Sequence, residues 1–472
     1  MERRNFIKTT VGTGIAINMT NVLESDDIHE PDSASDNIKR ELCARIDEQA
    51  TLIPDVVKDI GAHPELGFKE FRTSGVVNDF LRSAGYETEQ GLAITGVKAR
   101  LKKEYEGPNM AVLSELDGII CSESSWADKK TGATHNCGHN VQLGIMLAVA
   151  QAFKKSGVAS QLGGNISFIA APAEEYIELE YRTELRKRGD IRYFGGKQEL
   201  VRTGAFDDVD AAMMVHSQGN TPQPFVTVLN TGMGLIAETI RYTGKTAHAG
   251  IAPEEGVNAL YAAVLGLNAV NAMRETFRDE EHNRVHFIIT KGGEVVNSVP
   301  ADVRLEGMVR ASTVESMQRL LAKTERAFRS GGDALGAKTE IDRLSGYLPL
   351  SCHEKLNSVF ADNARLFMPD PQVSSVDFFK LSTDMGDISH LMPAIHPMSG
   401  GVEGALHAAN FQVVDYTAAV LTPAKIMACT LVDLLSGNAT KLKSITDNYH
   451  PLLTKQAYFE LLNSFFISHQ NV

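Results

Sequence analysis

Hydrophobic and polar positions repeat with different periods along the chain, and these periods predict its elements. From residue 38 to about residue 81 the apolar positions follow a helical spacing, as in Leu42, Ile46 and Ile53. Residues spaced by three, four or seven positions lie on one face of a helix. We therefore predict helices over this segment, and a further, strongly apolar helix over Thr422–Leu435.

Three short apolar runs are typical of buried strands, and each is followed by groups that can ionise. The runs at residues 110–113, 166–170 and 211–215 precede Glu115 and Asp117, Glu174 and Glu175, and His216. Strands that alternate with helices indicate an α/β sheet. Because ligands bind beyond the carboxyl ends of the strands in such sheets, we expect these acids and this imidazole to meet at one edge.

The pattern changes between residues 235 and 344. It predicts, in order, a strand, a helix, two strands, a helix and a strand, at residues 236–242, 255–277, 284–290, 303–310, 314–328 and 338–344. This β-α-β-β-α-β order is ferredoxin-like. It indicates a small α+β domain inserted into a larger α/β domain.

A chain of 472 residues exceeds the size at which one hydrophobic core keeps growing, so two domains are expected. The predicted fold class is α/β, a catalytic domain with a mixed central sheet plus an inserted ferredoxin-like α+β lid. The expected boundaries are 1–37 for an export-signal-like segment and linker, 38–234 for the first part of the catalytic domain, 235–344 for the lid, and 345–472 for the second part of the catalytic domain.

The amino-acid composition excludes some classes of binding partner. The hydrophobic content of 43% and the charged content of 22% are typical of a globular protein. The net charge of −13 disfavours binding to nucleic acid, because a nucleic-acid binder needs a basic face. No apolar run reaches the roughly 18 residues that span a bilayer. Five scattered cysteines do not form a disulfide framework, and four of them are expected to be small buried apolar residues.

The N-terminal segment Met1–Asn21 contains Arg3-Arg4 and then a mildly apolar stretch. This arrangement is similar to a twin-arginine export signal, which would make the protein periplasmic. The alternative is an ordinary basic N-terminus on a cytoplasmic protein. The segment Ser25–Asn37, rich in Asp, Ser and Pro, is predicted to be a linker.

The stretch from His135 to Asn140 is the part of the chain densest in metal-binding groups. Cys137 and His139 lie just before a predicted helix over residues 141–154, where backbone amides favour a thiolate. Taken alone, a cysteine and a histidine two residues apart are often incidental. Likewise, the acids Glu174 and Glu175 alone could be solvated residues at a helix start.

Considered together, the cysteine, the histidines and the acids indicate a metal site. A thiolate, imidazoles and carboxylates form a ligand set that suits zinc, or manganese where nitrogen and oxygen dominate. Structural zinc sites use more thiolates at short spacing, whereas these candidates are spread over about 80 residues. The spread favours an open catalytic site.

Motifs along the chain resemble, in order, those of one known family. They are His63–Phe68, His135–Asn140, Pro172–Glu175, Val215–His216, Gly244–Ala249, Asn297–Pro300, Ser382–Asp387 and Leu406–His407. The family is that of the metal-dependent amidohydrolases and peptidases, which includes carboxypeptidase G, aminoacylase and the plant auxin-conjugate hydrolases. The closing motifs are most similar to its p-aminobenzoyl-glutamate hydrolase branch. The similarity covers nearly the whole chain after Asn37.

The resemblance implies a site with two divalent metal ions, zinc or manganese. The implied ligands are Cys137, His139, Glu175, His216 and His407. Cys137 would take the place of an aspartate that bridges the ions in other branches. Glu174 would be the general base that removes a proton from a metal-activated water. Asp117 is expected to orient a ligand.

The resemblance also implies a homodimer that forms through the lid domain. His248 matches a histidine that stabilises the tetrahedral oxyanion, usually across the dimer, although it could be an exposed histidine in a turn. Asn297 and Arg310 match positions that hold the carboxylate or carbonyl of the substrate, although Arg310 could equally be a salt-bridge residue at a strand end.

The predicted activity is hydrolysis of a small-molecule amide, that of an N-acyl or p-aminobenzoyl amino acid. A dipeptidase or an N-acyl-amino-acid deacylase of the same family is the alternative. A different class, a catalytically inactive binding homologue, is disfavoured by the presence of Glu174. The residues Tyr176–Glu178 replace small glycines of the family, so the substrate itself is not defined by the resemblance.

Overall fold

The computed structural model describes residues 33–466 and 468–470. The predicted export segment Met1–Asn21 lies outside the described residues. Helix α1 (Ser33–Asp47) begins inside the predicted linker Ser25–Asn37. The linker prediction is therefore wrong for its last five residues, because they form the first turns of a helix whose apolar face packs on the core.

The larger part of the molecule is built on a mixed sheet with the order β1-β2-β6-β3-β7-β15. Its strands are Thr88–Leu92 (β1), Gly96–Arg100 (β2), Asn165–Ala171 (β6), Asn109–Glu115 (β3), Ala211–Met213 (β7) and Ala394–Ile395 (β15). The last four are parallel, and β1 and β2 are antiparallel. The three apolar runs are β3, β6 and β7, so the prediction of a mixed α/β sheet is confirmed.

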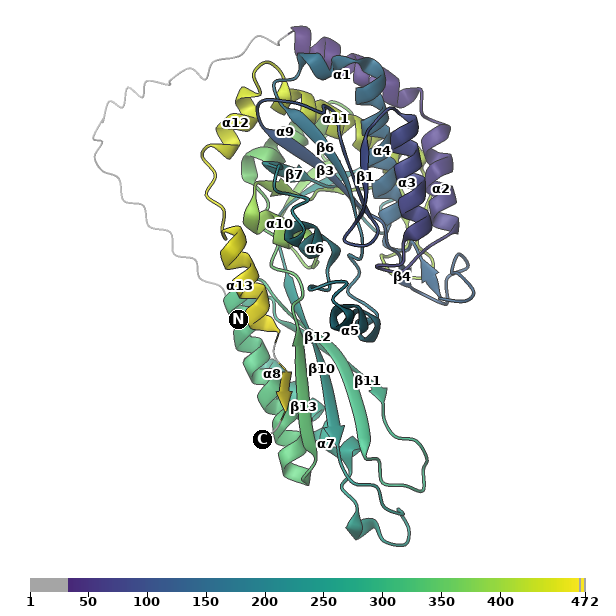
Figure 1. Cartoon of the computed structure of the whole chain (residues 1–472), viewed down its shortest axis with the longest axis vertical. Helices are drawn as coiled ribbons and strands as arrows, with labels where there is room; N and C mark the ends of the chain where they lie inside the picture. Colours follow the sequence, from purple (N-terminus) through teal and green to yellow (C-terminus); the bar gives the residue numbers. More distant parts are fainter. Residues whose placement is uncertain (1–32, 467, 471–472) are drawn as a thin grey trace, which may run out of the picture.

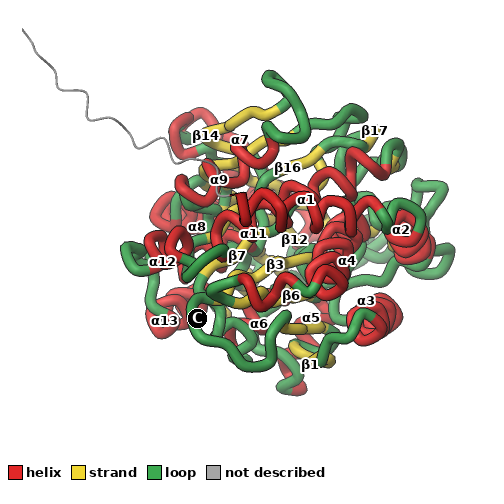
Figure 2. Tube along the Cα trace, turned by 90° about the horizontal axis from the view of Figure 1, so that it is seen from above, coloured by secondary structure: helices red, strands yellow, loops and turns green. Residues whose placement is uncertain are grey.

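Helices cover both faces of this sheet. One face carries α4 (His139–Ser156), with α1, α2 (Leu52–Ala62) and α11 (Thr422–Leu435) packed on it, as the view from above shows (Figure 2). The other face carries α6 (Gly196–Arg202) and α10 (Met385–Leu391). Successive β3 residues alternate between the two cores, with Met110 and Val112 in one and Ala111 and Leu113 in the other. Burial on both faces explains why β3 has no polar positions between Met110 and Leu113.

The helical segment Thr417–Leu435 is long and apolar enough, by length and composition, to cross a membrane. However, 83% of this window is buried inside the described part of the chain, against α1, α4 and α9 (Glu354–Ala364). Such burial is that of a core helix.

A second, four-stranded sheet lies next to the first and has the order β14-β9-β16-β8. Its strands are Val373–Phe379 (β14), Val226–Gly232 (β9), Met398–Ser399 (β16) and His216–Ser217 (β8). The chain passes from β7 into β8 through Met214 and Val215. His216 is thereby held at the junction of the two sheets.

The segment predicted as the lid forms an elongated lobe below the larger part of the molecule (Figure 1). Its elements are Gly234–Thr243 (β10), Ala259–Met273 (α7), Arg284–Lys291 (β11), Asp302–Ala311 (β12), Val314–Leu335 (α8) and Lys338–Leu344 (β13). The strand order β11-β12-β10-β13 with antiparallel neighbours is ferredoxin-like, as predicted.

One strand of the lid sheet was not predicted. After α13 (Lys455–Phe465), residues Ser468–Gln470 form β19 and pair with β13. The end of the chain thus contacts the lid. Three residues are too few to show a hydrophobic period, so no sequence pattern indicated this strand.

The cysteines are all free thiols, and their burial differs from the prediction. Besides Cys137, only Cys429 is buried, whereas Cys43, Cys121 and Cys352 are partly exposed. The expectation of four buried cysteines is therefore wrong for three of them. Cys43 lies on α1, with its Sγ atom 3.8 Å from that of Cys429 on α11.

Candidate metal centre

The loop that follows β5 (Ala133–Thr134) turns sharply into α4 and brings Cys137 and His139 together. Gly138 makes this turn with a φ of 85°, a left-handed conformation that favours glycine. A Cβ atom at Gly138 would lie only 2.7 Å from the Oγ atom of Ser217. The glycine therefore lets the loop pack directly against β8, which carries His216.

Cys137 is the centre of two groups of candidate ligands. Its Sγ atom lies 3.4 Å from Nε2 of His216 and 3.2 Å from Nε2 of His407. Nε2 of His407 is in turn 3.0 Å from Oε1 of Glu175. Cys137, His139 and His216 form one group and Cys137, Glu175 and His407 another, with the ligand atoms of each group within 4.8 Å of one another.

Neighbouring backbone and acidic groups orient the ligands. Asp117 follows β3, and its backbone oxygen lies 2.8 Å from Nδ1 of His139. The backbone N–H of Glu175 donates to Oδ2 of Asp117 over 2.9 Å. His216 is held through Nδ1, which lies 2.8 Å from the backbone oxygen of Ser217. Both histidines therefore turn their Nε2 atoms inward, and Asp117 lies where a ligand-orienting residue was expected.

Glu174 belongs to neither of these two groups, but with Glu115 and His139 it forms a third group whose ligand atoms also lie within 4.8 Å of one another. Its Oε2 atom is 4.0 Å from Nε2 of His139, and its backbone oxygen accepts a hydrogen bond from the hydroxyl of Tyr347. Burial, together with Glu115 and Glu175, raises the pKa of the Glu174 carboxyl well above its ordinary value. A carboxyl group in such surroundings readily holds a proton.

The other groups of the centre shift one another's pKa values toward the charged forms. Burial and Glu175 raise the pKa of the Cys137 thiol, but His216 and His139 outweigh them and lower it to about 6. Burial raises the pKa of Glu175, whereas His407 lowers it to about 2. Although burial lowers the pKa of His407, Glu175 and Cys137 raise it to about 11. Without metal, the imidazoles thus carry the positive charge that the anionic ligands require.

The residues fit a pair of divalent metal ions. The donor set mixes sulfur, nitrogen and oxygen, which suits zinc and also allows manganese. Nε2 of His139 and Oε1 of Glu175 are buried and lie 3.1 Å from Glu115 and 3.0 Å from His407, but neither contact within the described part of the chain has the geometry of a hydrogen bond. Both atoms belong to the candidate groups, so bound ions would satisfy them.

Sequence reasoning missed a charged layer beneath the centre. Glu115, the last residue of β3, lies 3.1 Å from Nε2 of His139 and 2.5 Å from Nζ of Lys197. Lys197 lies 2.5 Å from Asp384, and all three charged residues are buried. The only sequence signal was the position of Glu115 at the end of an apolar strand. Lys197 on α6 and Asp384 before α10 are distant from Glu115 in the sequence. The sequence therefore does not predict that these three residues pair.

Arg310 lies near Glu174 and Glu175, at the end of β12 that adjoins the larger domain. It has no carboxylate partner among the described residues, and its guanidinium contacts the sulfur of Met308 at 3.5 Å. Arg310 lines a cavity of about 580 Å³ between the segment Tyr176–Leu179, the lid strands β11 and β12, and Lys380. Burial lowers the pKa of the arginine, and the two glutamates oppose this effect.

His248 and Asn297 do not join the centre of their own subunit. β10 starts at Gly234 beside Pro349 of the larger domain and runs for ten residues, which is about 30 Å. His248 follows the far end of this strand, and the backbone oxygen of Asn297 accepts a hydrogen bond from Ala249. Both side chains are exposed at the tip of the lid.

Comparisons with known proteins agree with this architecture. Residues 231–334 match the model of the peptidase dimerisation domain. The chain is 26% identical over 416 residues to the Xaa-Arg dipeptidase of Mus musculus, a match that covers 84% of this chain and 89% of that protein. It is 29% identical over 309 residues to one of the polypeptides of the p-aminobenzoyl-glutamate hydrolase of Escherichia coli, covering 62% of this chain and 59% of that polypeptide.

Among solved structures, a dinuclear metal-binding peptidase of the M20 family from Bacillus subtilis superposes with a TM-score of 0.60 at 20% identity. This match covers 82% of the chain and 98% of the peptidase. Residues 231–334 therefore form a peptidase dimerisation domain, and the chain as a whole is similar to peptidases and amidohydrolases and shares the fold of a dinuclear metal-binding peptidase. The predicted resemblance to metal-dependent amidohydrolases and peptidases and the prediction of an enzyme are confirmed.

Proposed function

We propose that the protein hydrolyses the amide bond of an N-acyl or p-aminobenzoyl amino acid, with two zinc or manganese ions bound by Cys137, His139, Glu175, His216 and His407. One observation carries the proposal. The buried carboxyl of Glu174 lies beside two groups of ligands that share Cys137, and this site adjoins a cavity that contains Arg310.

The bound ions would polarise the amide carbonyl and lower the pKa of a water molecule. Glu174 takes the proton of the attacking water and passes it to the nitrogen of the leaving amine. Its raised pKa suits this task, because the carboxyl must hold the proton between the two transfers. Asp117 and Ser217 keep the histidine rings in place while this occurs.

Arg310 positions the substrate. A guanidinium group without a carboxylate partner among the described residues, close to the centre, suits the α-carboxylate of an amino acid, which it can bind through two parallel hydrogen bonds. The cavity of about 580 Å³ lies within the range of sites for small molecules. Its walls include Tyr176, Leu179 and Ile288, which suit an apolar or aromatic acyl group.

A second copy of the chain completes the site. The lid exposes large apolar side chains at Ile251, Tyr261, Val295 and Val296, a surface that another lid would cover. In a dimer formed through this surface, His248 and Asn297 of one subunit reach the centre of the other. His248 would then donate a hydrogen bond to the oxyanion.

A dipeptidase is the second candidate. Two acids, Glu178 and Glu306, line the same cavity, and Glu306 has no cationic partner among the described residues. Glu178 is already paired with Lys69 at 2.6 Å, so the Glu306 carboxylate is the one that suits a basic side chain or a free amino group of a dipeptide. The similarity to an Xaa-Arg dipeptidase favours the same alternative.

A substrate screen on the metal-loaded full chain decides between the candidates. We expect turnover of p-aminobenzoyl-glutamate, hippurate and N-acetyl amino acids, and loss of turnover when the α-carboxylate of each is replaced by an amide. Faster cleavage of dipeptides with a basic residue would establish the dipeptidase instead. Failure to hydrolyse any of these amides, with both ions bound, would contradict the proposal.

A further inference from the structure

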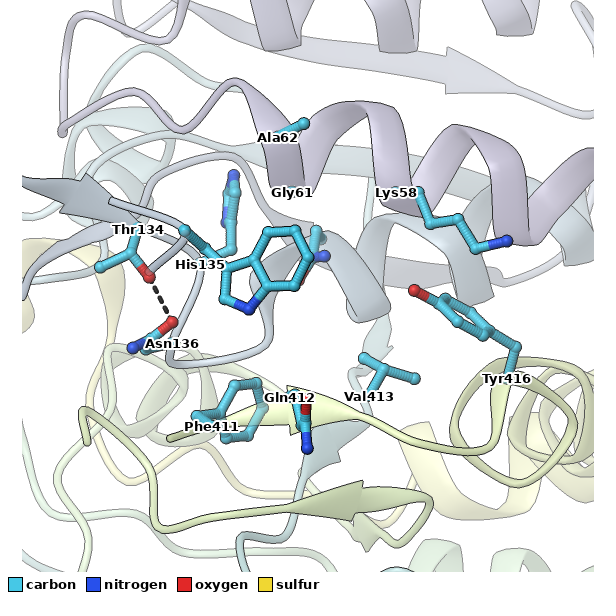
Figure 3. A pocket seen from close by; sticks show the side chains of 12 residues that line it. Lys58, Gly61, Ala62, Thr134, His135, Asn136, Phe411, Gln412, Val413 and Tyr416 are labelled. Carbon is cyan, nitrogen blue, oxygen red and sulfur yellow. Dashed lines mark hydrogen bonds between the residues drawn. The ribbon is translucent and has the colours of Figure 1, made fainter. Parts of the chain in front are cut away.

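A separate small pocket is lined in part by Thr134–Asn136, the residues that directly precede Cys137. Its walls come from α2, from the segment Thr134–Asn136 and from residues 411–416, as Figure 3 shows. Its volume of about 160 Å³ is below the 300–1,000 Å³ typical of drug-sized ligands, so only a molecule with about one ring fits.

Two side chains of this pocket have unused hydrogen-bonding capacity. His135 is only 5% exposed, and neither of its ring nitrogens has a hydrogen-bond partner in the described part of the chain. Asn140 is 8% exposed; its Nδ2 donates to the backbone oxygen of Val57, but its Oδ1 has no partner among the described residues. Buried polar groups are usually satisfied, so these atoms point to a ligand that supplies both a donor and an acceptor.

The remaining walls define the chemistry of that ligand. Trp126, Phe411 and Tyr416 give the pocket aromatic surfaces, against which a planar ring packs well. Lys58 is the one charged residue among the described residues of the lining, and its Nζ atom lies 5.0 Å from the centre of the Tyr416 ring. Lys58 has an acidic neighbour, Asp55 at 3.5 Å, in an exposed and therefore weak pair.

We propose that this pocket binds a small aromatic carboxylate that carries an amino or hydroxyl group. The ring lies between the aromatic walls, the carboxylate faces Lys58, and the amino or hydroxyl group bonds to His135 and Asn140. The site is distinct from the substrate cavity, and it does not depend on which amide the enzyme cleaves.

Occupation of the pocket would act on the metal centre through Asn136. The backbone oxygen of Asn136 accepts a hydrogen bond from the N–H of His407 over 2.8 Å, and its Nδ2 donates to Ala408 over 2.7 Å. Asn136 and Phe411 both line the pocket. A ligand there fixes the two loops that carry Cys137 and His407, so it changes kcat rather than KM.

Trp126, the only tryptophan of the chain, reports on the pocket directly. We would titrate the full chain with benzoate, 4-hydroxybenzoate and 4-aminobenzoate, follow the fluorescence of Trp126, and measure the same binding by calorimetry. We expect saturable binding with a Kd on the order of 0.1–1 mM, with the two substituted acids binding more tightly than benzoate. Binding should persist after a chelator has removed the metal ions.

Two variants make the test specific. Lys58→Met should weaken binding of the acids about tenfold, and should leave binding of the uncharged benzamide unchanged. The matched control Lys441→Met removes an exposed lysine on α12 (Thr440–Thr446) and should have no effect. His135→Phe should abolish the preference for the substituted acids.

Absence of saturable binding would overturn the proposal. Binding that is lost with the metal ions would also overturn it, because the acids would then occupy the metal centre. Equal affinities of the Lys58→Met and Lys441→Met variants would exclude the predicted orientation of the carboxylate.

Discussion

The metal centre and the tip of the lid differ in how completely one chain builds them. At the centre, groups from four distant parts of the sequence converge, and the neighbouring backbone already orients their side chains. At the tip, His248 and Asn297 are exposed and far from the centre of their own subunit. One chain thus brings the candidate metal ligands together, whereas His248, in the oxyanion role that we propose for it, acts from a second chain.

The same contrast appears in the buried acids of the two regions. Glu174 at the centre and Glu238 on β10 of the lid are both buried with a raised pKa. Glu174 lies beside candidate ligands, whereas Glu238 faces Thr324 and Glu325 inside the lid. We therefore expect the first acid to affect catalysis and the second to affect stability.

The largest effect is expected for Glu174→Gln. Removal of the general base should lower kcat about 10³-fold, because no other described group at the centre is placed to carry the proton. Bound metal, measured by elemental analysis, and the melting temperature should remain those of the wild type. The control Glu180→Gln, at an exposed position on α5 (Leu179–Arg188), should retain full activity. Full activity of Glu174→Gln would refute the assignment.

Loss of the shared ligand should have the next largest effect. Since Cys137 belongs to both groups, Cys137→Ala should weaken the binding of both ions, by about 100-fold, whereas His407→Ala should weaken mainly one. Competition with a chelator and the metal content per subunit measure this difference. If Cys137→Ala kept two tightly bound ions, the cysteine would not be a bridge.

Glu238 should link the stability of the lid to pH. Burial, followed by Glu325, raises the pKa of Glu238 to about 8, so the folded chain keeps a proton that the unfolded chain releases above about pH 4.5. The free energy of unfolding should therefore fall as the pH rises from about 5 to about 8. Glu238→Gln should remove about 2 kcal/mol of this fall and leave kcat unchanged. Denaturant unfolding of the wild type and of Glu238→Gln at pH 5 and pH 8 measures this change in the free energy of unfolding. The same pH dependence in both proteins would contradict the raised pKa of Glu238.

The smallest of these effects concerns the substrate. Arg310→Met should raise KM about tenfold for substrates with a free α-carboxylate, because a charge-assisted hydrogen bond is lost. It should leave KM unchanged for the same substrates with an amide in place of the carboxylate. Equal effects on both series would show that Arg310 does not bind the carboxylate.

Sequence patterns predicted the parts of the fold that have a clear period. The strands β3 and β6, the helix α4 and the order of elements in the lid follow from runs long enough to show alternation or a helical repeat. The sheet that holds His216 was not predicted, because β8 and β16 are only two residues long. Strands this short form because they pair with segments that are distant in the sequence. A local pattern of hydrophobic residues does not predict such pairing.

The candidate ligands were found because short motifs and a family resemblance named them. Glu115 was expected at the edge of the sheet, but its pairing with Lys197 was not predicted, because that pairing arises from contacts between β3, α4 and α6. The placement of Arg310 near the centre and of His248 far from it depended on the direction of the lid strands. That direction follows from the three-dimensional packing of the two domains.

Activity of a mixed dimer tests the central claim most directly. His248→Ala and Glu174→Ala, each inactive alone, would be co-expressed with different tags and the heterodimer purified. One of its two sites then combines an intact Glu174 with an intact His248 from the other chain, so the heterodimer should show about half of the wild-type activity. A heterodimer as inactive as the two parent variants, with its metal ions bound, would contradict a site shared between the two chains.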